Sequence, residues 1–497
     1  MHRGWDLPEL RHQIFDALGN QARNGSLFQL ARTCHLFSDQ ALSLLWERQE
    51  DLIPLLKCFP AHKWEEASVG SFRFRSSLKV EDWDRVLQYS RLIRTFRACP
   101  YDMNLDESVM QSWIMSMPLV PIMPNLRVLG MRSDSNLFPY IRFLLGAQVS
   151  TINIYLVGPV WRLAGLGFIA SSCPAIRYLE LEDPILEDPG KNEESIDRVS
   201  SVVTQLWHLH TVKTGSLNAA AYLHLSRLPH LEALDGDVIE GVFTPLHNSP
   251  DAPRFPALRQ LSLSAESITH VTNFMAQVES APLTAVGITT RSFSAGPDYR
   301  AFFSALVSHC SSHLTSVRIH LDRTRFPRDT AEIPGSAMTS DLIRPLLKLS
   351  NVTVLHLTAP LGFSFDDDFV VAMALSWPKI ETLSLAADIY EVDFHSSPRN
   401  PTILSLLSFA RHCPNLRHLA MAVDATNVQT HHPSLSSWII QTTLESLNLL
   451  HSPIGTPVAV AQLLSSIFPR LLAVTGNTLG SGEVKRLVED GRELSAS

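Results

Sequence analysis

Three short stretches of the sequence carry side chains that could do chemistry, each at a site of its own. The stretch from Gly165 to Ala170 spells G-x-G-x-x-A, which in a nucleotide-binding unit holds a pyrophosphate at the start of a helix. The triplet Asp366-Asp367-Asp368 offers three carboxylates, the hard oxygen ligands that divalent cations prefer. The pair His431-His432 offers two imidazoles, which are common zinc ligands.

The surroundings of these stretches favour structural roles. The glycine string lies between two strand-like segments, where a repeat helix explains it, and the aspartates stand where a helix begins and complement its dipole. The histidine pair has no cysteine or carboxylate at metal-ligand spacing, and the sequence has no G-x-S-x-G, P-loop or HExxH motif. We therefore expect no catalytic residue, no metal, no cofactor and no enzymatic activity. A hydrolase or nucleotide-binding protein built on repeats is the weakest alternative.

A repeated phrase organises most of the chain. Cys413 to Met421 contains the pattern L-x-x-L-x-L, whose alternating apolar residues predict a short strand with one buried face, and the preceding proline stops a helix. The phrase occurs thirteen times at a mean spacing of about 29 residues. A weaker copy begins at Ile93. The thirteen copies begin at Leu126, Val149, Ile176, Leu209, Leu231, Leu258, Leu283, Leu314, Val352, Ile380, Leu416, Leu444 and Leu471.

This recurrence predicts an α/β fold of the leucine-rich-repeat solenoid kind, with parallel strands on a concave face and helices on a convex face. A single unit cannot bury its own apolar face, so the units must stack. Helices are expected near 139–145, 195–207, 299–307, 402–410 and 458–467. We predict a solenoid over 93–480, a junction over 51–92 with a strand at 72–74 and a helix at 81–89, and a C-terminal cap over 481–497 whose helix stops at Gly491.

The phrase also indicates which side chains face the concave side. In L-x-x-L-x-L the leucines point into the core, so the third residue, the fifth residue and the residue after the last apolar slot point outward. They predict an acidic patch early in the solenoid and a histidine-bearing patch later, or alternatively a solvated polar surface. The candidate substrate-binding residues are Glu180, Glu182, Lys213, Asp235, Asp237, Arg318, His320, His356 and His418.

Composition narrows the classes of function. The chain of 497 residues is 45% hydrophobic and 18% charged, as expected of a folded chain, and its net charge is −8. Because nucleic acid is bound by a basic stripe, this balance disfavours nucleic acid as the ligand. No apolar run is long enough to span a membrane. The six cysteines include no CxxC pair and predict reduced thiols in a cytoplasmic or nuclear protein, with Cys173 and Cys413 at a buried corner of their repeats.

The first residues differ from the repeats. The segment 5–46 predicts three short helices, with 19–26 as a loop and Gly25-Ser26 as a stop and N-cap before the second helix. The apolar face of the second helix would include Leu27, Leu30 and Cys34, and the third helix would begin near Asp39. Three helices over about 40 residues are near the lower limit for an independent core. Part of their apolar surface must therefore be covered by the solenoid or by another protein.

The same segment carries a family resemblance over residues 3–50. Leu7-Pro8-Glu9, Ile14-Phe15-x-x-Leu18, Leu27-x-x-Leu30-Ala31-x-Thr33-Cys34-x-x-Phe37 and Leu45-Trp46 resemble an F-box. The chain as a whole is similar in architecture to the fungal F-box proteins with leucine-rich repeats. The family often has valine before the cysteine and tryptophan where Phe37 stands.

The resemblance implies a function. It implies that the helical face docks a Skp-type adaptor, that the adaptor joins a cullin-RING ligase, and that the repeats hold a protein substrate for ubiquitination. The chain would be the substrate-recognition subunit of a Skp-cullin-F-box type E3 ubiquitin ligase. The alternative is a non-catalytic interaction scaffold whose F-box-like cap does not assemble into a ligase. The adaptor-facing residues implied by the resemblance are Leu7, Pro8, Ile14, Phe15, Leu18, Leu27, Leu30, Cys34 and Trp46.

Overall fold

Every copy of the repeat phrase forms a parallel strand that begins two residues after the first apolar slot of that copy. The copy at Leu126 gives β5 (Val128–Arg132), and the copy at Leu471 gives β19 (Ala473–Thr475). The weaker copy at Ile93 gives β4 (Thr95–Arg97). The predicted phrase is confirmed as the unit of a repeating α/β array.

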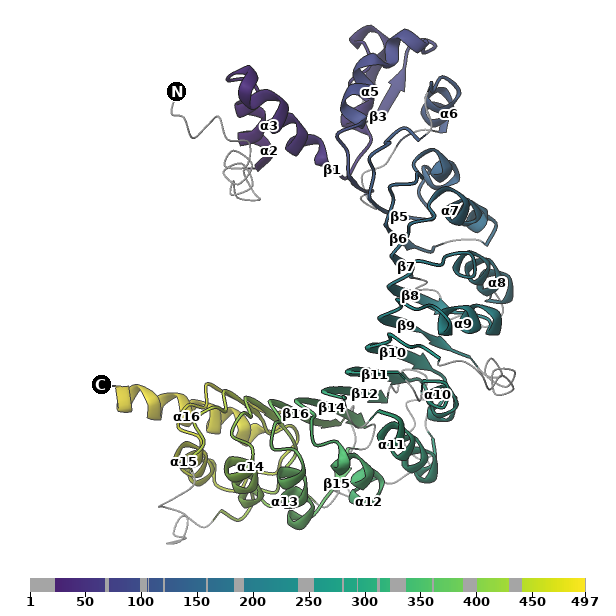
Figure 1. Ribbon diagram of the computed structural model, residues 1–497. Coiled ribbons are helices and arrows are strands. Elements are labelled where there is room, and N and C mark those ends of the chain that lie inside the picture. The colour runs from purple at the N-terminus through teal and green to yellow at the C-terminus, as the bar shows by residue number, and fades with distance from the viewer. Residues whose placement is uncertain are drawn as a thin grey trace. The chain divides into compact units, whose positions relative to one another are not determined.

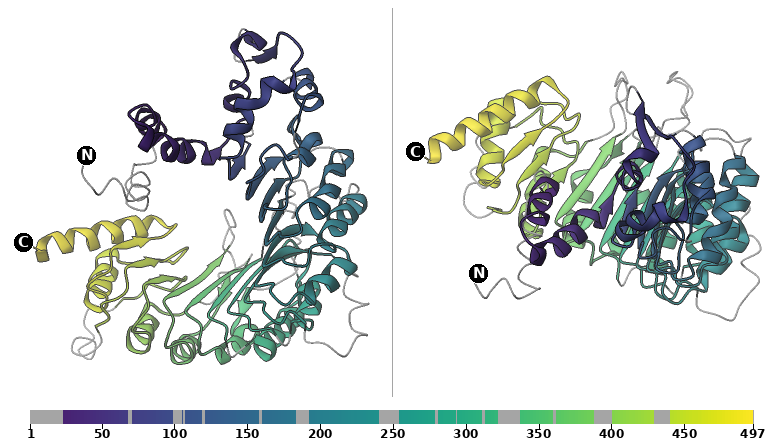
Figure 2. Two further views of the ribbon diagram at one scale, coloured as in Figure 1. Left: turned by 45° about the horizontal axis from the view of Figure 1, so that its top comes forward. Right: turned by 90° about the horizontal axis from the view of Figure 1, so that it is seen from above.

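The computed structural model describes residues 23–67, 71–98, 105, 107–118, 121–157, 160–182, 192–239, 254–278, 281–292, 294–310, 313–321, 337–359, 362–387, 400–428 and 440–496. The chain divides into two compact units, Met1–Leu228 (unit 1) and Pro229–Ser497 (unit 2). Within each unit the strands stand side by side, and the helices that connect successive strands line one side of them (Figure 1, Figure 2).

Unit 1 contains helices, short 3-10 helices (η) and strands in an order set by the repeats. The elements are α2 (Arg23–Ala31), α3 (His35–Glu47), β1 (Arg48–Gln49), α4 (Ile53–Leu56), η2 (Ala61–Lys63), β2 (Trp64–Ala67), β3 (Ser71–Phe74), η3 (Val80–Trp83), α5 (Asp84–Ser90), β4, α6 (Glu107–Met115), β5, η4 (Phe138–Phe143), β6 (Thr151–Tyr155), η5 (Val160–Leu166), α7 (Gly167–Ser172), β7 (Tyr178–Glu182), α8 (Asn192–Val203), β8 (Thr211–Ser216) and α9 (Ala219–Ser226).

Unit 2 continues the alternation of strand and helix. The elements are β9 (Ala233–Val238), β10 (Gln260–Ala265), α10 (Ile268–Met275), β11 (Ala285–Thr290), α11 (Gly296–Cys310), β12 (Ser316–Leu321), β13 (Met338–Thr339), α12 (Ser340–Ile343), η8 (Arg344–Lys348), β14 (Val354–Ala359), β15 (Phe363–Ser364), α13 (Asp367–Ser376), β16 (Thr382–Ala387), η9 (Ile403–Ser405), α14 (Leu406–His412), β17 (His418–Ala420), β18 (Ser446–Asn448), α15 (Pro457–Ile467), β19 and α16 (Leu479–Ala496). The five helices expected from the sequence coincide with η4, α8, α11, η9 with α14, and α15.

The strands of each unit follow one another in chain order. Unit 1 has the order β1-β4-β5-β6-β7-β8, and unit 2 has β9-β10-β11-β12-β14-β16-β17-β18-β19, all parallel. Side chains alternate along each strand, so that in β12 Val317, Ile319 and Leu321 are buried and the residues between them are not. We call the side that carries the less buried residues the open face.

The pairing register aligns equivalent residues of successive repeats in straight rows on the open face. The third residues of the phrases pair with one another, as Tyr178 does with Thr151, and so do the fifth and the seventh residues. We call these the first, second and third rows. The rows follow because the helical connections always bring the chain back to the same register.

A corner between helix and strand is filled by a large or polarisable side chain followed by proline. Cys173, Trp377, Cys413 and Phe468 each end a helix with φ between −128° and −119° and ψ between 61° and 75°, and all four are fully buried. The sulfur of Cys413 lies 3.5 Å from the Ala374 carbonyl oxygen. The predicted buried position of both cysteines is confirmed.

The N-terminal helices differ from the prediction in their limits. Gly25 and Ser26 lie inside α2 and are not its stop or cap, and Cys34 is the N-cap residue of α3 and not part of the apolar face of α2. The helix α3 runs directly into β1, whose Arg48 pairs with Thr95 of β4. The strand β1 was not predicted because no repeat phrase precedes it.

The segment between β1 and β4 has its own small core. The strands β2 and β3 pair antiparallel, which confirms the predicted strand at 72–74, and the rings of Phe59 and Phe72 pack against neighbouring aromatic rings. Phe59 also contacts Trp83 edge to face at 5.0 Å. An ion pair joins Lys63 Nζ to Asp82 Oδ2 at 3.1 Å beside this core, and both side chains are almost fully buried.

The C-terminal helix is longer than predicted. The helix α16 continues through Gly491 to Ala496, so the expected stop at Gly491 is wrong. One glycine costs a helix about 1 kcal/mol, and neighbouring helix-forming residues offset that cost. Val484 and Val488 of α16 are buried, as expected of a helix that packs on the end of an array.

Candidate interaction surfaces

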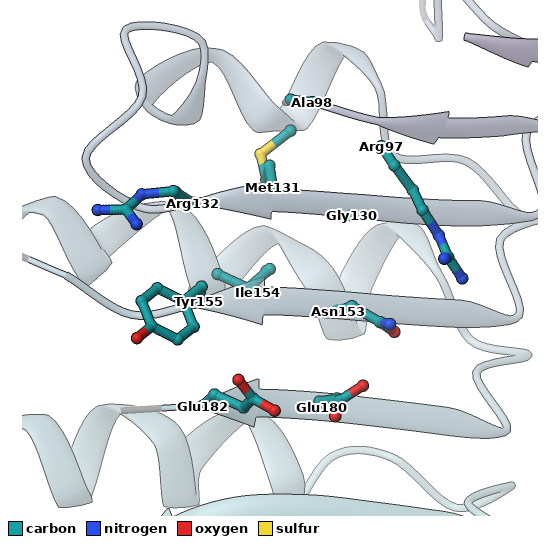
Figure 3. Close-up of a pocket in the computed structure, with 10 residues that line it drawn as sticks. All are labelled: Arg97, Ala98, Gly130, Met131, Arg132, Asn153, Ile154, Tyr155, Glu180 and Glu182. Carbon is teal, nitrogen blue, oxygen red and sulfur yellow. The ribbon is translucent and has the colours of Figure 1, made fainter. Parts of the chain in front are cut away.

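The open face of unit 1 brings together residues that are far apart in the sequence. The second row runs Arg97, Gly130, Asn153, Glu180 and Lys213 across β4 to β8. In the third row, Arg132 pairs with Tyr155 and Tyr155 with Glu182. Ten residues line a hollow of about 290 Å³ here (Figure 3): Arg97, Ala98, Gly130, Met131, Arg132, Asn153, Ile154, Tyr155, Glu180 and Glu182.

A glycine forms part of the floor of this hollow. A Cβ atom at Gly130 would lie 3.1 Å from Cγ of Arg97, so a larger residue would make the Arg97 stem shift from its place across β5. Figure 3 shows the Arg97 side chain reaching past Gly130 toward β6. There Asn153 Oδ1 is buried and has no hydrogen-bond partner among the described residues. An exposed cation and an unsatisfied amide oxygen therefore stand at one end of the hollow.

At the other end, Glu180 is held by two neighbours. The Tyr178 hydroxyl donates to Glu180 Oε2 at 2.8 Å, and Lys213 Nζ lies 3.4 Å from Glu180 Oε1. Burial raises the pKa of the Tyr178 hydroxyl, and its hydrogen bond to Glu180 adds to this. The hydrogen bond with Tyr178, followed by the charge of Glu180, raises the pKa of Lys213. Tyr178 and Lys213 thus hold the Glu180 carboxylate in place at the rim of the hollow.

Arg132 is also held in place at the hollow. Its guanidinium donates two hydrogen bonds to Asp134, at 2.9 Å and 2.8 Å, and stands over the Tyr155 ring at 5.2 Å. This arrangement orients the planar face of Tyr155 beside the exposed Glu182. The hollow has an aromatic face, carboxylates, and the Arg97 guanidinium, which pairs with no acidic side chain among the described residues. Such a hollow can bind a polar segment of protein.

In unit 2 the two aspartates predicted to bind substrate, Asp235 and Asp237, have different surroundings. Asp235 stands in the second row of the open face and is half-buried. Asp237 stands in the third row, is buried, and pairs with Arg291 at 3.3 Å. Arg291 thus partly covers Asp237, which makes Asp237 a structural ion pair more than a contact surface.

The predicted histidine-bearing patch is present only in part. Arg318 and His356 are neighbours in the second row, and His320 follows Arg318 in the third. Burial lowers the pKa of His356, and the positive charge of Arg318 lowers it further. His418 lies in the first row and two strands away from His356, so it does not join the group.

The helix pair α2 and α3 carries the described part of the predicted adaptor surface. Leu27 is fully buried with Ala41 and Leu44, which gives it a packing role, and Leu30 packs only partly against that core. Cys34 is half-exposed, and the Trp46 ring stacks on Tyr89 at 4.7 Å. Leu7, Pro8, Ile14, Phe15 and Leu18 lie outside the described residues.

Apolar surface remains uncovered on this pair. Its described residues include only three that are buried, and Phe28 is 49% exposed. Leu30, Ala31, Phe37 and Leu45 border the small core without being enclosed by it. A second protein could therefore dock on the pair.

The described stretches that the sequence singled out for possible chemistry, the glycine string and the aspartate triplet, have structural roles. The glycine string forms the end of η5 and the start of α7, on the helical side of its repeat. Asp366 caps α13, and its side chain accepts from the Phe369 N–H at 2.9 Å. His431 and His432 lie outside the described residues. Across the described ranges, no group of three His, Cys, Asp or Glu side chains is placed to hold a metal ion.

Several residues of the hollow were missed by sequence reasoning. Arg97, Asn153 and Tyr155 occupy the fifth and seventh positions of their copies, the same positions that singled out Glu180 and Glu182. Reading every copy at those positions would have found them. The place of Gly130 in the hollow could not be predicted from the sequence, because it depends on the Arg97 side chain, which crosses Gly130 from the preceding strand.

Comparison with known proteins leaves the family open. No protein-family model and no curated protein matches the chain. Among solved structures, the chain is similar to one in the yeast Rad7 and Elc1 complex, with 14% identity, 71% of this chain and 82% of that chain covered, and a TM-score of 0.34. It is also similar to one in the Drosophila Toll-Spatzle complex, with 11% identity, coverage of 82% and 53%, and a TM-score of 0.34. Similarity at this level assigns neither a family nor a partner. No described helix has both the length and the apolar character needed to cross a bilayer.

Proposed function

We propose that this chain is the substrate-recognition subunit of a Skp-cullin-F-box type E3 ubiquitin ligase. Residues 3–50 are an F-box that binds the Skp-type adaptor, and the leucine-rich repeats bind a protein substrate through the open face. The observation that supports this most is the uncovered apolar surface of α2 and α3, on which Phe28 is 49% exposed. The polar hollow on the open face of unit 1 supports a separate site for substrate.

This role needs no chemistry from the chain itself. Holding the substrate and the ligase on one molecule raises the effective concentration of substrate lysines near the conjugating enzyme, and reaction follows from proximity. The adaptor and the substrate would occupy different elements, so that one can bind without displacing the other.

Adaptor binding is tested with full-length protein and a purified Skp-type adaptor. We expect capture of the adaptor by the wild-type chain and its loss in Pro8→Glu and Leu18→Glu, because a charge in an apolar interface is left unpaired. The matched control is Leu375→Glu on α13, an apolar side chain that is 57% exposed and far along the chain. Adaptor binding that persists in both N-terminal variants rules out an F-box role.

The second candidate is an interaction scaffold that does not assemble into a ligase. It is favoured by Trp46, a predicted adaptor contact, which stacks on Tyr89 of the same chain. Affinity purification with and without residues 1–50 separates the two functions. A ligase subunit loses adaptor and cullin on truncation and keeps its substrates, whereas a scaffold keeps all its partners.

A further inference from the structure

Within each unit, the second residues of the repeat phrases form a column at the start of the strands. In unit 1 the backbone N–H of Arg127 donates to the Arg94 carbonyl at 2.8 Å, and Ser150 donates to Arg127 at 2.9 Å. Arg177 donates to Ser150 at 2.9 Å, and His210 donates to Arg177 at 2.8 Å. These bonds join successive repeats, so each residue of the column stands about 4.8 Å from the next one. The two ends of the column, Arg94 and His210, are 116 positions apart in the sequence.

This column is basic in unit 1. Arg94, Arg127 and Arg177 are exposed, and no described residue forms an ion pair or a hydrogen bond with the guanidinium group of any of the three. Ser150 and His210 add hydrogen-bonding groups between and beyond them. The acidic residue of the column is Glu47 at its start, whose carbonyl accepts from the Arg94 N–H at 2.9 Å.

The equivalent column of unit 2 has a different character. There the same position is held by Glu232, Arg259, Thr284, Thr315, Thr353, Glu381, Arg417, Glu445 and Leu472, joined by the same kind of backbone bond. Its charges alternate in sign, and Arg417 pairs with Glu445 at 3.5 Å. The threonine hydroxyls bond to the carbonyl of the preceding repeat at 3.1 to 3.2 Å. Uncompensated positive charge is therefore a property of the column in unit 1 and not of the repeat position.

We propose that the column of Arg94, Arg127 and Arg177 is a docking surface for an acidic, extended segment of a partner protein. The planar guanidinium group of arginine binds a carboxylate with two hydrogen bonds. The column exposes three such groups, each of which can bind a carboxylate of the partner. From Arg94 to Arg177 the column spans three strand steps, about 14 Å, which an extended chain covers in about four or five residues. The chain as a whole carries a charge of −8, so an acidic segment is steered to this patch and repelled elsewhere.

This proposal does not depend on the F-box proposal, because the three arginines lie outside residues 3–50. Within 3–50, the column involves only the carbonyl of Glu47 at the end of α3, which accepts from the Arg94 N–H. A nucleic acid could also supply anions, but the basic column is short and the net charge of the chain repels a long polyanion. The structure therefore favours a protein segment, and the test includes an oligonucleotide.

The test uses full-length protein and a fluorescent peptide of about ten residues in which Glu and Ser alternate, with a Gln-Ser peptide and a single-stranded DNA of equal charge for comparison. We expect the Glu peptide to bind and the Gln peptide not to bind. The triple variant Arg94→Gln, Arg127→Gln and Arg177→Gln should bind the Glu peptide roughly tenfold more weakly or worse. The control variant Arg259→Gln with Arg417→Gln, in the same column of unit 2, should bind as the wild type does.

Salt gives a second measurement that needs no variant. Because exposed ion pairs are screened, the affinity of the wild-type chain should fall steadily as NaCl rises from about 50 to about 300 mM. Equal binding of the Glu peptide by the wild-type chain and the triple variant, or an affinity that does not respond to salt, overturns the proposal. Tighter binding of the DNA than of the Glu peptide overturns the choice of a protein partner.

Discussion

The buried sulfur of Cys413 links the backbones of two successive repeats. This sulfur lies near the carbonyl oxygens of Ala374 and Trp377, at 3.5 and 3.6 Å, and burial raises the pKa of the Cys413 thiol to about 12. A thiol with such a pKa supplies almost no thiolate at neutral pH. Its role is to fill the corner, and it should not react.

Alkylation of the native protein tests this role. Iodoacetamide at pH 7.5 should modify Cys34, which is half-exposed, at least about tenfold faster than Cys173, Cys310 or Cys413, which are buried. Site-resolved mass spectrometry measures the rates, and unfolding in guanidinium should make all sites react. Modification of Cys413 at the rate of Cys34 in the folded chain would contradict the structure.

Asp82 gives a prediction for pH. The Lys79 backbone N–H donates to Asp82 Oδ2 at 2.8 Å and lowers the pKa of Asp82; burial opposes this shift, and the Lys63 ammonium reinforces it. The folded pKa lies below the unfolded one, so the unfolded chain binds more protons at low pH. The stabilisation is present above about pH 4, the usual aspartate pKa, and is lost as pH falls through the folded pKa.

The variant Asp82→Asn isolates this contribution. It should be less stable than the wild type at pH 7, because it leaves the buried Lys63 without its counter-ion, and the difference should shrink toward pH 3. Denaturant titrations at several pH values measure it. Asp341→Asn, which removes an exposed carboxylate, is the control and should show little effect at any pH.

The direction in which a side chain points could be predicted where it depends only on the position of the residue in the repeat phrase. The outward direction of Glu180 and Lys213 follows from counting along L-x-x-L-x-L, and the register places them side by side. The burial of Asp237 could not be predicted, because it depends on Arg291, a residue 54 positions later. The place of Trp46 on Tyr89 likewise depends on how a helix turns into β1.

At the scale of elements, two glycines have different roles: one allows two backbone segments to approach closely, and the other only lowers the stability of a helix. A Cβ atom at Gly455 would lie 2.1 Å from the Thr426 carbonyl oxygen, where the backbone of one repeat crosses the next. Gly482 in α16 has nothing within 4 Å of the equivalent atom. The first glycine is required by close approach, whereas the second only weakens its helix.

Two alanine substitutions therefore have opposite signs. Gly455→Ala should lower the free energy of unfolding by about 1–3 kcal/mol, since backbone must move to admit the methyl group. Gly482→Ala should raise it by about 0.5–1 kcal/mol, because alanine is the better helix former. Each is the other's control in a single set of urea titrations. A stabilising effect of Gly455→Ala would mean that the two backbones do not meet there.

Strands were predicted better than helix limits for a physical reason. A strand of this array is fixed by the alternation of its own residues and by its neighbours on both sides, so Leu126 and Leu471 give the same outcome. The ends of α2, α3 and α16 depend on packing. Gly25 and Gly491 are typical of turns, yet both lie inside helices.

At the scale of the whole molecule, the order of the strands determines how disturbances spread. Contacts in a repeat array are mainly between neighbours, so stability is close to a sum of local terms. In unit 2 the strands β10, β11 and β12 pair over six residues, whereas β17, β18 and β19 pair over three. The C-terminal strands should therefore exchange their amide hydrogens faster than the central ones.

Val484→Asp tests this locality. Val484 is fully buried in α16, and an aspartate there is an unpaired buried charge that loosens α16 first. Exchange measured by mass spectrometry should rise about tenfold or more in α16 and β19, since about 1.4 kcal/mol of local stability corresponds to a factor of ten. The strands β10 and β11 should keep their wild-type rates, and Arg486→Asp, at an exposed position of the same helix, should change little. Equal acceleration in every strand of unit 2 would mean that the unit opens as one cooperative body, and the neighbour-only account of the array would then be wrong.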